Sequence, residues 1–218
     1  MADRSFKIKK NREDTLNILR ILVSVLNKYN IAYYLDFGTL LGAVREKELI
    51  PWDDDIDISL LNKNDYEKIP NLVKEIKNKY KLRTYLFTFK SSRERRIING
   101  NKIYEEKIKF TDDNNYQILK IRNNRFWIFG RGNVNIDVFF KYHQGDNLFW
   151  LADGKSNKIS NNIINDELIK IKFYDIQCTI PKNYDEYLTT IYGDWKTPNK
   201  DWVENDSITQ VKNDLKND

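Results

Sequence analysis

The stretch Ile50-Pro-Trp-Asp-Asp-Asp-Ile-Asp-Ile58 places four carboxylates within five consecutive residues and frames them with apolar side chains. Carboxylates this close repel one another, and burial among the flanking isoleucines would also strip their hydration. A bound cation removes most of this cost. Because every available ligand atom is an oxygen, a hard divalent ion such as Mg²⁺ or Mn²⁺ fits best. The stretch therefore predicts a metal-dependent phosphoryl-transfer enzyme.

Alternation along a strand indicates which of these acids act together. Asp55 and Asp57 point the same way, ~7 Å apart at Cα for a rise of ~3.3 Å per residue. A two-metal site needs a further carboxylate from a neighbouring strand. Asp137 is the best candidate, because it lies between Ile136 and Val138 in an otherwise apolar strand. We therefore predict Asp55, Asp57 and Asp137 as metal ligands and catalytic residues.

Each assignment leaves an alternative open. The acid cluster alone also fits a solvated loop or a calcium loop, although no EF-hand spacing follows it. Asp53 joins the metal-facing side if the strand begins early. Asp137 alone also fits an edge strand facing water. Asp112, Asp113 and Asp146 lie in more loop-like contexts and are the other candidates for the third ligand.

A glycine-containing turn precedes the acid-bearing strand. Gly38-Thr39 stands between an expected strand and a short helix, where free backbone N–H groups and the absence of a side chain suit a donor phosphate. Arg45, at the end of that helix, has the bidentate geometry for a phosphate. A surface salt bridge from Arg45 to Glu46 or Glu48 is the alternative.

The composition of the chain is typical of a folded domain and argues against nucleic-acid-binding and membrane-spanning proteins. The chain has 218 residues, is 40% hydrophobic and carries a net charge of +5, which together indicate a folded domain. The basic residues form no dense stripe, so we expect no nucleic-acid partner. No run approaches the ~18 apolar residues of a membrane span, and no export signal opens the chain. We therefore expect no membrane span and a cytoplasmic location.

The scarcity of two residue types excludes other chemistries. Cys178 is the single cysteine, which rules out a disulfide within the chain, and it lies in a strand-like run typical of a core residue. His143 is the single histidine, so a structural zinc site and a Ser-His-Asp triad are both poorly supported. Neither residue is expected to take part in the reaction.

Periodicity predicts one α+β domain over 1–218, with a mixed sheet, a core of about 12–200 and a loose polar tail at about 204–218. Loops are expected at 46–51 and 91–101. Expected helices are 14–29, 40–45, 64–80 and 181–193, and expected strands are 31–36, 54–60, 82–89, 102–110, 116–122, 125–129, 134–142, 147–151 and 168–180.

Two segments together resemble a known family. Gly38-Thr-Leu-Leu-Gly-Ala-Val-Arg45, followed by the stretch at 50–58, is similar to the signature of the LicD family, to which the fukutin-related proteins are distantly related. Pro181–Trp195 with Pro198 resembles the family's C-terminal Tyr-Gly element, whereas 61–130 shows little resemblance. The resemblance implies a nucleotidyltransferase-like mixed β-sheet core flanked by helices, with additional strands.

The resemblance also implies an activity. LicD-like proteins transfer phosphocholine, or another phospho-alcohol or phospho-sugar, from a nucleotide-activated donor such as CDP-choline to a glycan hydroxyl. By position, Gly38 and Thr39 would hold donor phosphate. Asp55, Asp57 and Asp137 would hold magnesium, and Asp137 would also accept the acceptor's proton.

Two other functions remain open on the sequence. One is a nucleotidyltransferase of the same fold that moves NMP to a protein, RNA or small molecule. The other is a non-catalytic protein that binds carbohydrate or metal. For the acceptor, Tyr192, Trp195 and Trp202 offer an aromatic platform, with core packing as the equally supported alternative.

Overall fold

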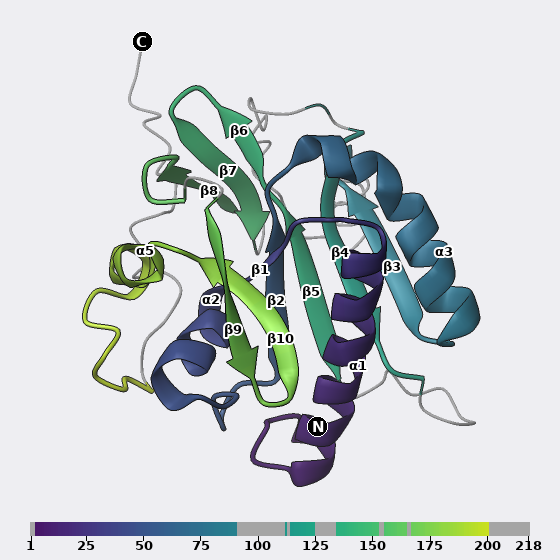
Figure 1. Ribbon diagram of the computed structural model, residues 1–218, viewed down its shortest axis with the longest axis horizontal. Helices are drawn as coiled ribbons and strands as arrows, with labels where there is room; N and C mark the ends of the chain where they lie inside the picture. The colour runs from purple at the N-terminus through teal and green to yellow at the C-terminus, as the bar shows by residue number, and fades with distance from the viewer. Residues whose placement is uncertain are drawn as a thin grey trace, which may run out of the picture.

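The computed structural model describes residues 3–90, 112, 114–124, 134–152, 155–164 and 167–200. Its centre is a five-stranded sheet in the order β1-β2-β5-β4-β3 (Figure 1). The strands are β1 Tyr34–Leu35, β2 Asp55–Leu60, β5 Asn135–Phe140, β4 Tyr116–Arg122 and β3 Arg83–Thr88. Strands β2 and β5 are parallel and the other neighbours are antiparallel, so the sheet is mixed and the predicted α+β fold class is confirmed.

The long helices pack beside this sheet. Helix α1, Lys9–Lys28, packs on β5 and on α3, Ile69–Lys79, and α3 packs on β3. The apolar positions of α1 at three- and four-residue spacing are buried, as the periodicity predicts. Side chains between the acids, such as Ile56 and Ile136, are 0% exposed and point to the face opposite the carboxylates. One face of the sheet is therefore hydrophobic core, which leaves the other for the acids.

Smaller elements complete the fold. Helix α2, Phe37–Leu41, continues directly into the π-helix η1, Gly42–Glu46. The remaining elements are the 3-10 helix η2 Lys63–Lys68, the antiparallel strands β6 Tyr142–Gln144, β7 Asn147–Ala152 and β8 Lys155–Ser160, the hairpin β9 Leu168–Phe173 and β10 Ile176–Pro181, and helix α5 Tyr184–Tyr192.

Several element boundaries differ from the sequence-based expectation. Helix α1 begins at Lys9 instead of Asp14, and the amide of Asn11, in its first turn, donates to the backbone oxygens of Asp3 and Ser5 in the preceding turn. The strand expected over 31–36 shortens to β1, and the strand expected over 134–142 divides into β5 and β6 at Lys141. The strands expected at 102–110 and 125–129, the loop at 91–101 and the tail at 204–218 lie outside the described residues.

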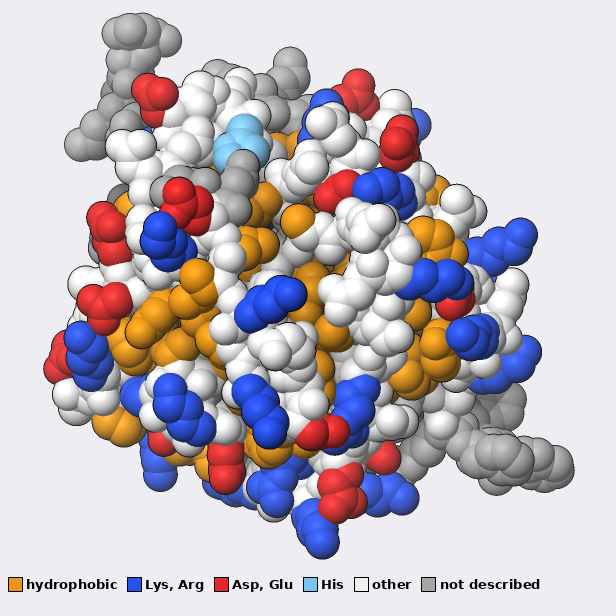
Figure 2. All heavy atoms as spheres, in the orientation of Figure 1, with side chains coloured by type: hydrophobic (Ala, Val, Ile, Leu, Met, Phe, Trp, Pro, Cys, Tyr) orange, Lys and Arg blue, Asp and Glu red, His pale blue; other side chains and the backbone are white. Residues whose placement is uncertain are grey.

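The polar surface is mixed in charge. On the face shown in Figure 2, Lys and Arg side chains are interspersed with Asp and Glu side chains. This pattern agrees with the small net charge of +5. Among the described residues, no helix combines the length and the apolar character that crossing a membrane requires.

Candidate metal centre and the cavity around it

The register between the two parallel strands brings the predicted acids together. Asp57 on β2 lies directly opposite Asp137 on β5, and Asp55 lies opposite Asn135. One carboxylate oxygen from each of Asp55, Asp57 and Asp137 lies within 4.8 Å of the other two. Three oxygen ligands at this spacing suit an octahedral Mg²⁺ that keeps water for a substrate phosphate.

The electrostatics of the three acids favour a bound cation. Burial, followed by the charges of Asp53 and Asp137, raises the pKa of the Asp55 carboxyl to about 7. Burial, followed by the charge of Asp55, raises the pKa of Asp57 well above its ordinary value. Ionising both groups is therefore costly in the metal-free protein. A hard divalent cation offsets that cost, so the residues present fit such an ion.

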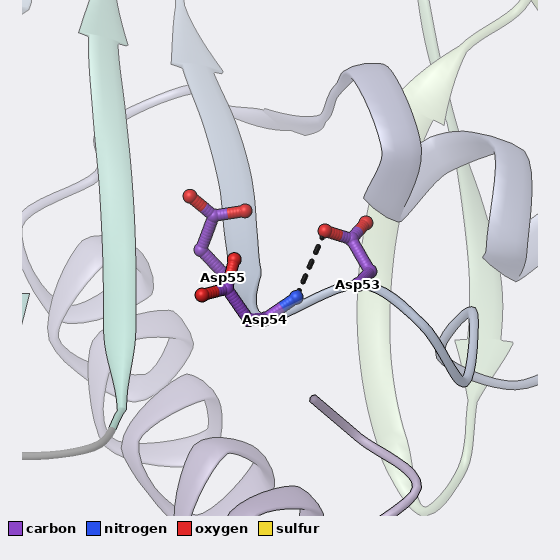
Figure 3. Close-up of side chains that lie close together, drawn as sticks. All are labelled: Asp53, Asp54 and Asp55. Carbon is purple, nitrogen blue, oxygen red and sulfur yellow. Dashed lines mark hydrogen bonds between the residues drawn. The ribbon is translucent and has the colours of Figure 1, made fainter. Parts of the chain in front are cut away.

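Asp53 belongs to a different part of the site. Strand β2 begins at Asp55, so Asp53 precedes the strand, and Figure 3 shows its carboxylate beside α2, where it accepts from the Asp54 backbone N–H at 3.0 Å. A Cβ added to Gly38 would meet Asp53 Oδ2 at 2.6 Å, so Gly38 allows this close approach. Burial raises the pKa of Asp53 to about 6. Together with the exposed Asp54, Asp53 and Asp55 form a second set of oxygens within 4.8 Å.

The three residues predicted to bind donor phosphate differ in their access to the cavity in front of the acids. Gly38 lines the cavity in front of the acids. Thr39 is 2% exposed, and its hydroxyl accepts from the Asp57 backbone N–H at 2.9 Å, which ties α2 to β2. Arg45 also lines the cavity, but its guanidinium donates to Glu46 and to the backbone oxygen of Trp195 at 2.7 and 2.8 Å. The salt bridge to Glu46 is thus present alongside access to the cavity.

The acids lie in a cavity of about 610 Å³. This volume is in the range of sites for small molecules and cofactors. Away from the acids the walls are largely aromatic and aliphatic, and Tyr192 and Trp195 are among the lining residues. Trp202, the third member of the predicted aromatic platform, lies outside the described residues.

Two polar residues that sequence analysis missed hold the third acid. Asn135 donates from Nδ2 to Asp137 Oδ1 at 2.7 Å, and Lys120 on β4 donates from Nζ to Asp137 Oδ2. Lys120 lies in register with Asp137 and lines the cavity. Its signal was a lysine between Leu119 and Ile121 in a strand of buried apolar residues.

A second missed feature is a buried ion pair behind the site. Lys141, directly after β5, and Asp36, directly before α2, are both 0% exposed and lie 2.7 Å apart. The Asp36 carboxylate also accepts from the Phe37 backbone N–H at 2.8 Å and from the hydroxyls of Ser59 and Tyr187. Burial lowers the pKa of Lys141, although Asp36 opposes that shift. The pair joins α2, β2, β5 and α5 around one charge centre.

The raised pKa values predict how pH affects the metal-free protein. Asp53 and Asp55 keep their protons to about 6 and about 7 in the folded state, whereas unfolded aspartate loses its proton near ~4. The folded state thus binds more protons between these values, and stability falls as pH rises through that range. In EDTA, the melting temperature should fall from pH 5 to pH 8 more steeply than in Asp55→Asn, and parallel curves would contradict this expectation.

The sequence matches a known protein family. Residues 30–183 match the family described as LicD/FKTN/FKRP, nucleotidyltransferase domain. The lipopolysaccharide cholinephosphotransferase LicD of Haemophilus influenzae is 45% identical over 53 residues, which is 24% of this chain and 20% of that protein. The human ribitol-5-phosphate transferase FKTN is 22% identical over 206 residues, which is 93% of this chain and 37% of that protein.

Two further proteins are similar to parts of this chain. The human ribitol 5-phosphate transferase FKRP is 44% identical over 41 residues, 19% of this chain and 8% of that protein. Among solved structures, the lincomycin-bound lincosamide antibiotic adenylyltransferase LnuA covers 79% of this chain and 83% of its own, at 10% identity and a TM-score of 0.41. The matched segments span 37% or less of the length of each of these curated relatives.

Proposed function

The chain belongs to the LicD/FKTN/FKRP nucleotidyltransferase-domain family, and from that membership we propose that it is a metal-dependent transferase. The enzyme moves a phospho-alcohol or phospho-sugar group, phosphocholine foremost, from a nucleotide-activated donor such as CDP-choline to a glycan hydroxyl. The observation that carries this proposal is the convergence of Asp55, Asp57 and Asp137 at the edge of a cavity large enough for a nucleotide-activated donor. The proposal combines this oxygen ligand set with the phospho-alcohol chemistry named for the relatives.

The metal-binding residues have defined parts in this reaction. Asp55 and Asp57 on β2 and Asp137 on β5 would hold Mg²⁺, or Mn²⁺, on the open face of the sheet. When bound, such an ion neutralises phosphate charge and stabilises the charge that develops on the transferred phosphoryl group. Asn135 keeps the Asp137 carboxylate in one orientation through the 2.7 Å hydrogen bond.

The chemical step is an in-line displacement at phosphorus. The acceptor's hydroxyl oxygen forms a bond to the phosphorus that bears the alcohol, the bond from that phosphorus to the bridging oxygen breaks, and CMP leaves with the bonding electrons. The hydroxyl proton passes to the carboxylate of Asp137, which acts as general base. Tyr192, on the wall of the same cavity, would stack against the acceptor sugar, whereas Trp195 is 8% exposed and packs mainly in the core.

Mass spectrometry of the acceptor tests what is transferred. Glycan acceptors are incubated with Mg²⁺ and CDP-choline, CDP-ribitol or CDP-glycerol, after a thermal-shift screen has shown which donor raises the melting temperature. We expect a gain equal to the phospho-alcohol, with CMP released. A gain equal to CMP, with the alcohol phosphate released, would instead establish nucleotidyl transfer. Product formation that persists in excess EDTA would contradict the metal requirement.

A further inference from the structure

Lys120 is a cation within reach of the predicted metal ligands. It projects from β4 at the position paired with Asp137 on β5, and its ammonium donates to Asp137 Oδ2. The lysine side chain is 31% exposed, against 8% for the carboxylate side chain. Lys120 thus lies between the buried acid and the open cavity, which both residues line.

Metal binding by Asp137 is opposed by one of its two contacts. A carboxylate oxygen has two lone pairs, so the neutral Asn135 amide on Oδ1 can stay in place, whereas the ammonium of Lys120 on Oδ2 repels an incoming cation. Asn135 is 9% exposed and lies on the same strand two residues away, which restricts its movement. Lys120 has a long flexible stem and a partly exposed ammonium. The contact that opens is therefore the one to Lys120.

Charge balance indicates where the released ammonium goes. Asp55, Asp57 and Asp137 bring three negative charges, and one divalent ion leaves a single negative charge that would repel an anionic donor. The ammonium of Lys120, still within the cavity, offsets this remaining charge of the three acids. Phosphate oxygens are strong acceptors for an ammonium group and are the anions that a nucleotide-activated donor would bring to this wall.

We propose that Lys120 has two alternating partners: it neutralises Asp137 while no metal is bound, and it contacts the donor's pyrophosphate once a metal holds Asp137. This inference rests on the proposed function, because that function places a pyrophosphate in the cavity. The two roles predict opposite changes in two affinities, which a purely structural ion pair would not produce. Removing the ammonium should strengthen metal binding and weaken pyrophosphate binding.

The test uses Lys120→Met, which keeps the length of the side chain and removes its charge. Mn²⁺ alone is titrated by electron paramagnetic resonance, and inorganic pyrophosphate is titrated by calorimetry at saturating Mg²⁺. We expect Mn²⁺ to bind ~3- to 10-fold more tightly, because no ion pair has to open. We expect pyrophosphate to bind ~10- to 100-fold more weakly, because a charge-assisted contact is lost. Lys120→Arg should keep pyrophosphate affinity within a few-fold.

A matched control separates this effect from a general loss of charge. Lys182→Met removes another paired lysine, 2.6 Å from Glu167 and 59% exposed, and should leave both affinities unchanged. Unchanged or weaker Mn²⁺ binding in Lys120→Met would overturn the competition with Asp137, and unchanged pyrophosphate binding would overturn the phosphate contact. Failure of the unsubstituted protein to transfer a phospho-alcohol, with both affinity shifts present, would overturn the proposed function alone.

Discussion

Replacing Asp57 by asparagine should lower the turnover rate by at least ~100-fold, the range expected for a lost metal ligand, while leaving the protein folded. Asparagine keeps the shape of the side chain and removes one of three charges whose oxygens lie within 4.8 Å of each other. Because the repulsion from Asp55 disappears, the metal-free variant should melt at the same temperature as the unsubstituted protein or higher. Steady-state assays at saturating Mg²⁺ and melting curves in EDTA measure the two quantities.

Asp54→Asn is the matched control for this prediction. It removes an equal charge from the same segment, but Asp54 is exposed and belongs to the other acidic set, with Asp53 and Asp55. We expect its rate to stay within a few-fold of normal. An inactive Asp54→Asn together with a normal Asp57→Asn would move the metal to that second set. Asp137→Asn should behave as Asp57→Asn does.

Replacing Lys141 by methionine should destabilise the protein by ~3–5 kcal/mol, because it leaves a buried carboxylate without its cation. Lys141 and Asp36 are both 0% exposed and lie 2.7 Å apart, so no solvent is available to take over the role of the ammonium. The ammonium also lies 4.1 Å from the centre of the Trp150 ring, a cation–π contact whose charge methionine lacks. Urea denaturation gives the free energy of unfolding.

Two further variants test whether burial of the ion pair is the reason for the expected loss of stability in Lys141→Met. The double variant Lys141→Met with Asp36→Asn removes both charges and should recover part of the loss, because no unpaired ion remains. Lys182→Met breaks an exposed pair with Glu167 and should cost at most ~1 kcal/mol. A loss in Lys141→Met no larger than in Lys182→Met would mean that the buried pair adds no more than a surface one.

Much of the arrangement of the candidate site can be predicted from the sequence, because the positions of its acids depend on the local pattern of polar and apolar residues. Alternation along a strand places Asp55 and Asp57 on one face wherever that strand lies, and β2 spans Asp55–Leu60 against an expected 54–60. An acid in an apolar run also marks Asp137 as unusual. The same local reasoning explains the misses, since β8, Lys155–Ser160, is a strand despite a polar sequence and owes its state to pairing with β7.

What the sequence by itself determined was a carboxylate-bearing strand, a mixed α+β fold and a resemblance that the family match over 30–183 confirms. Only the tertiary structure decided which partners those acids have. Lys120 meets Asp137 because β4 pairs with β5, and Lys141 meets Asp36 because the end of β5 lies beside the start of α2. Periodicity reports the face on which a side chain lies, whereas ion pairs between distant segments depend on strand order and register, which arise only when the whole sheet assembles.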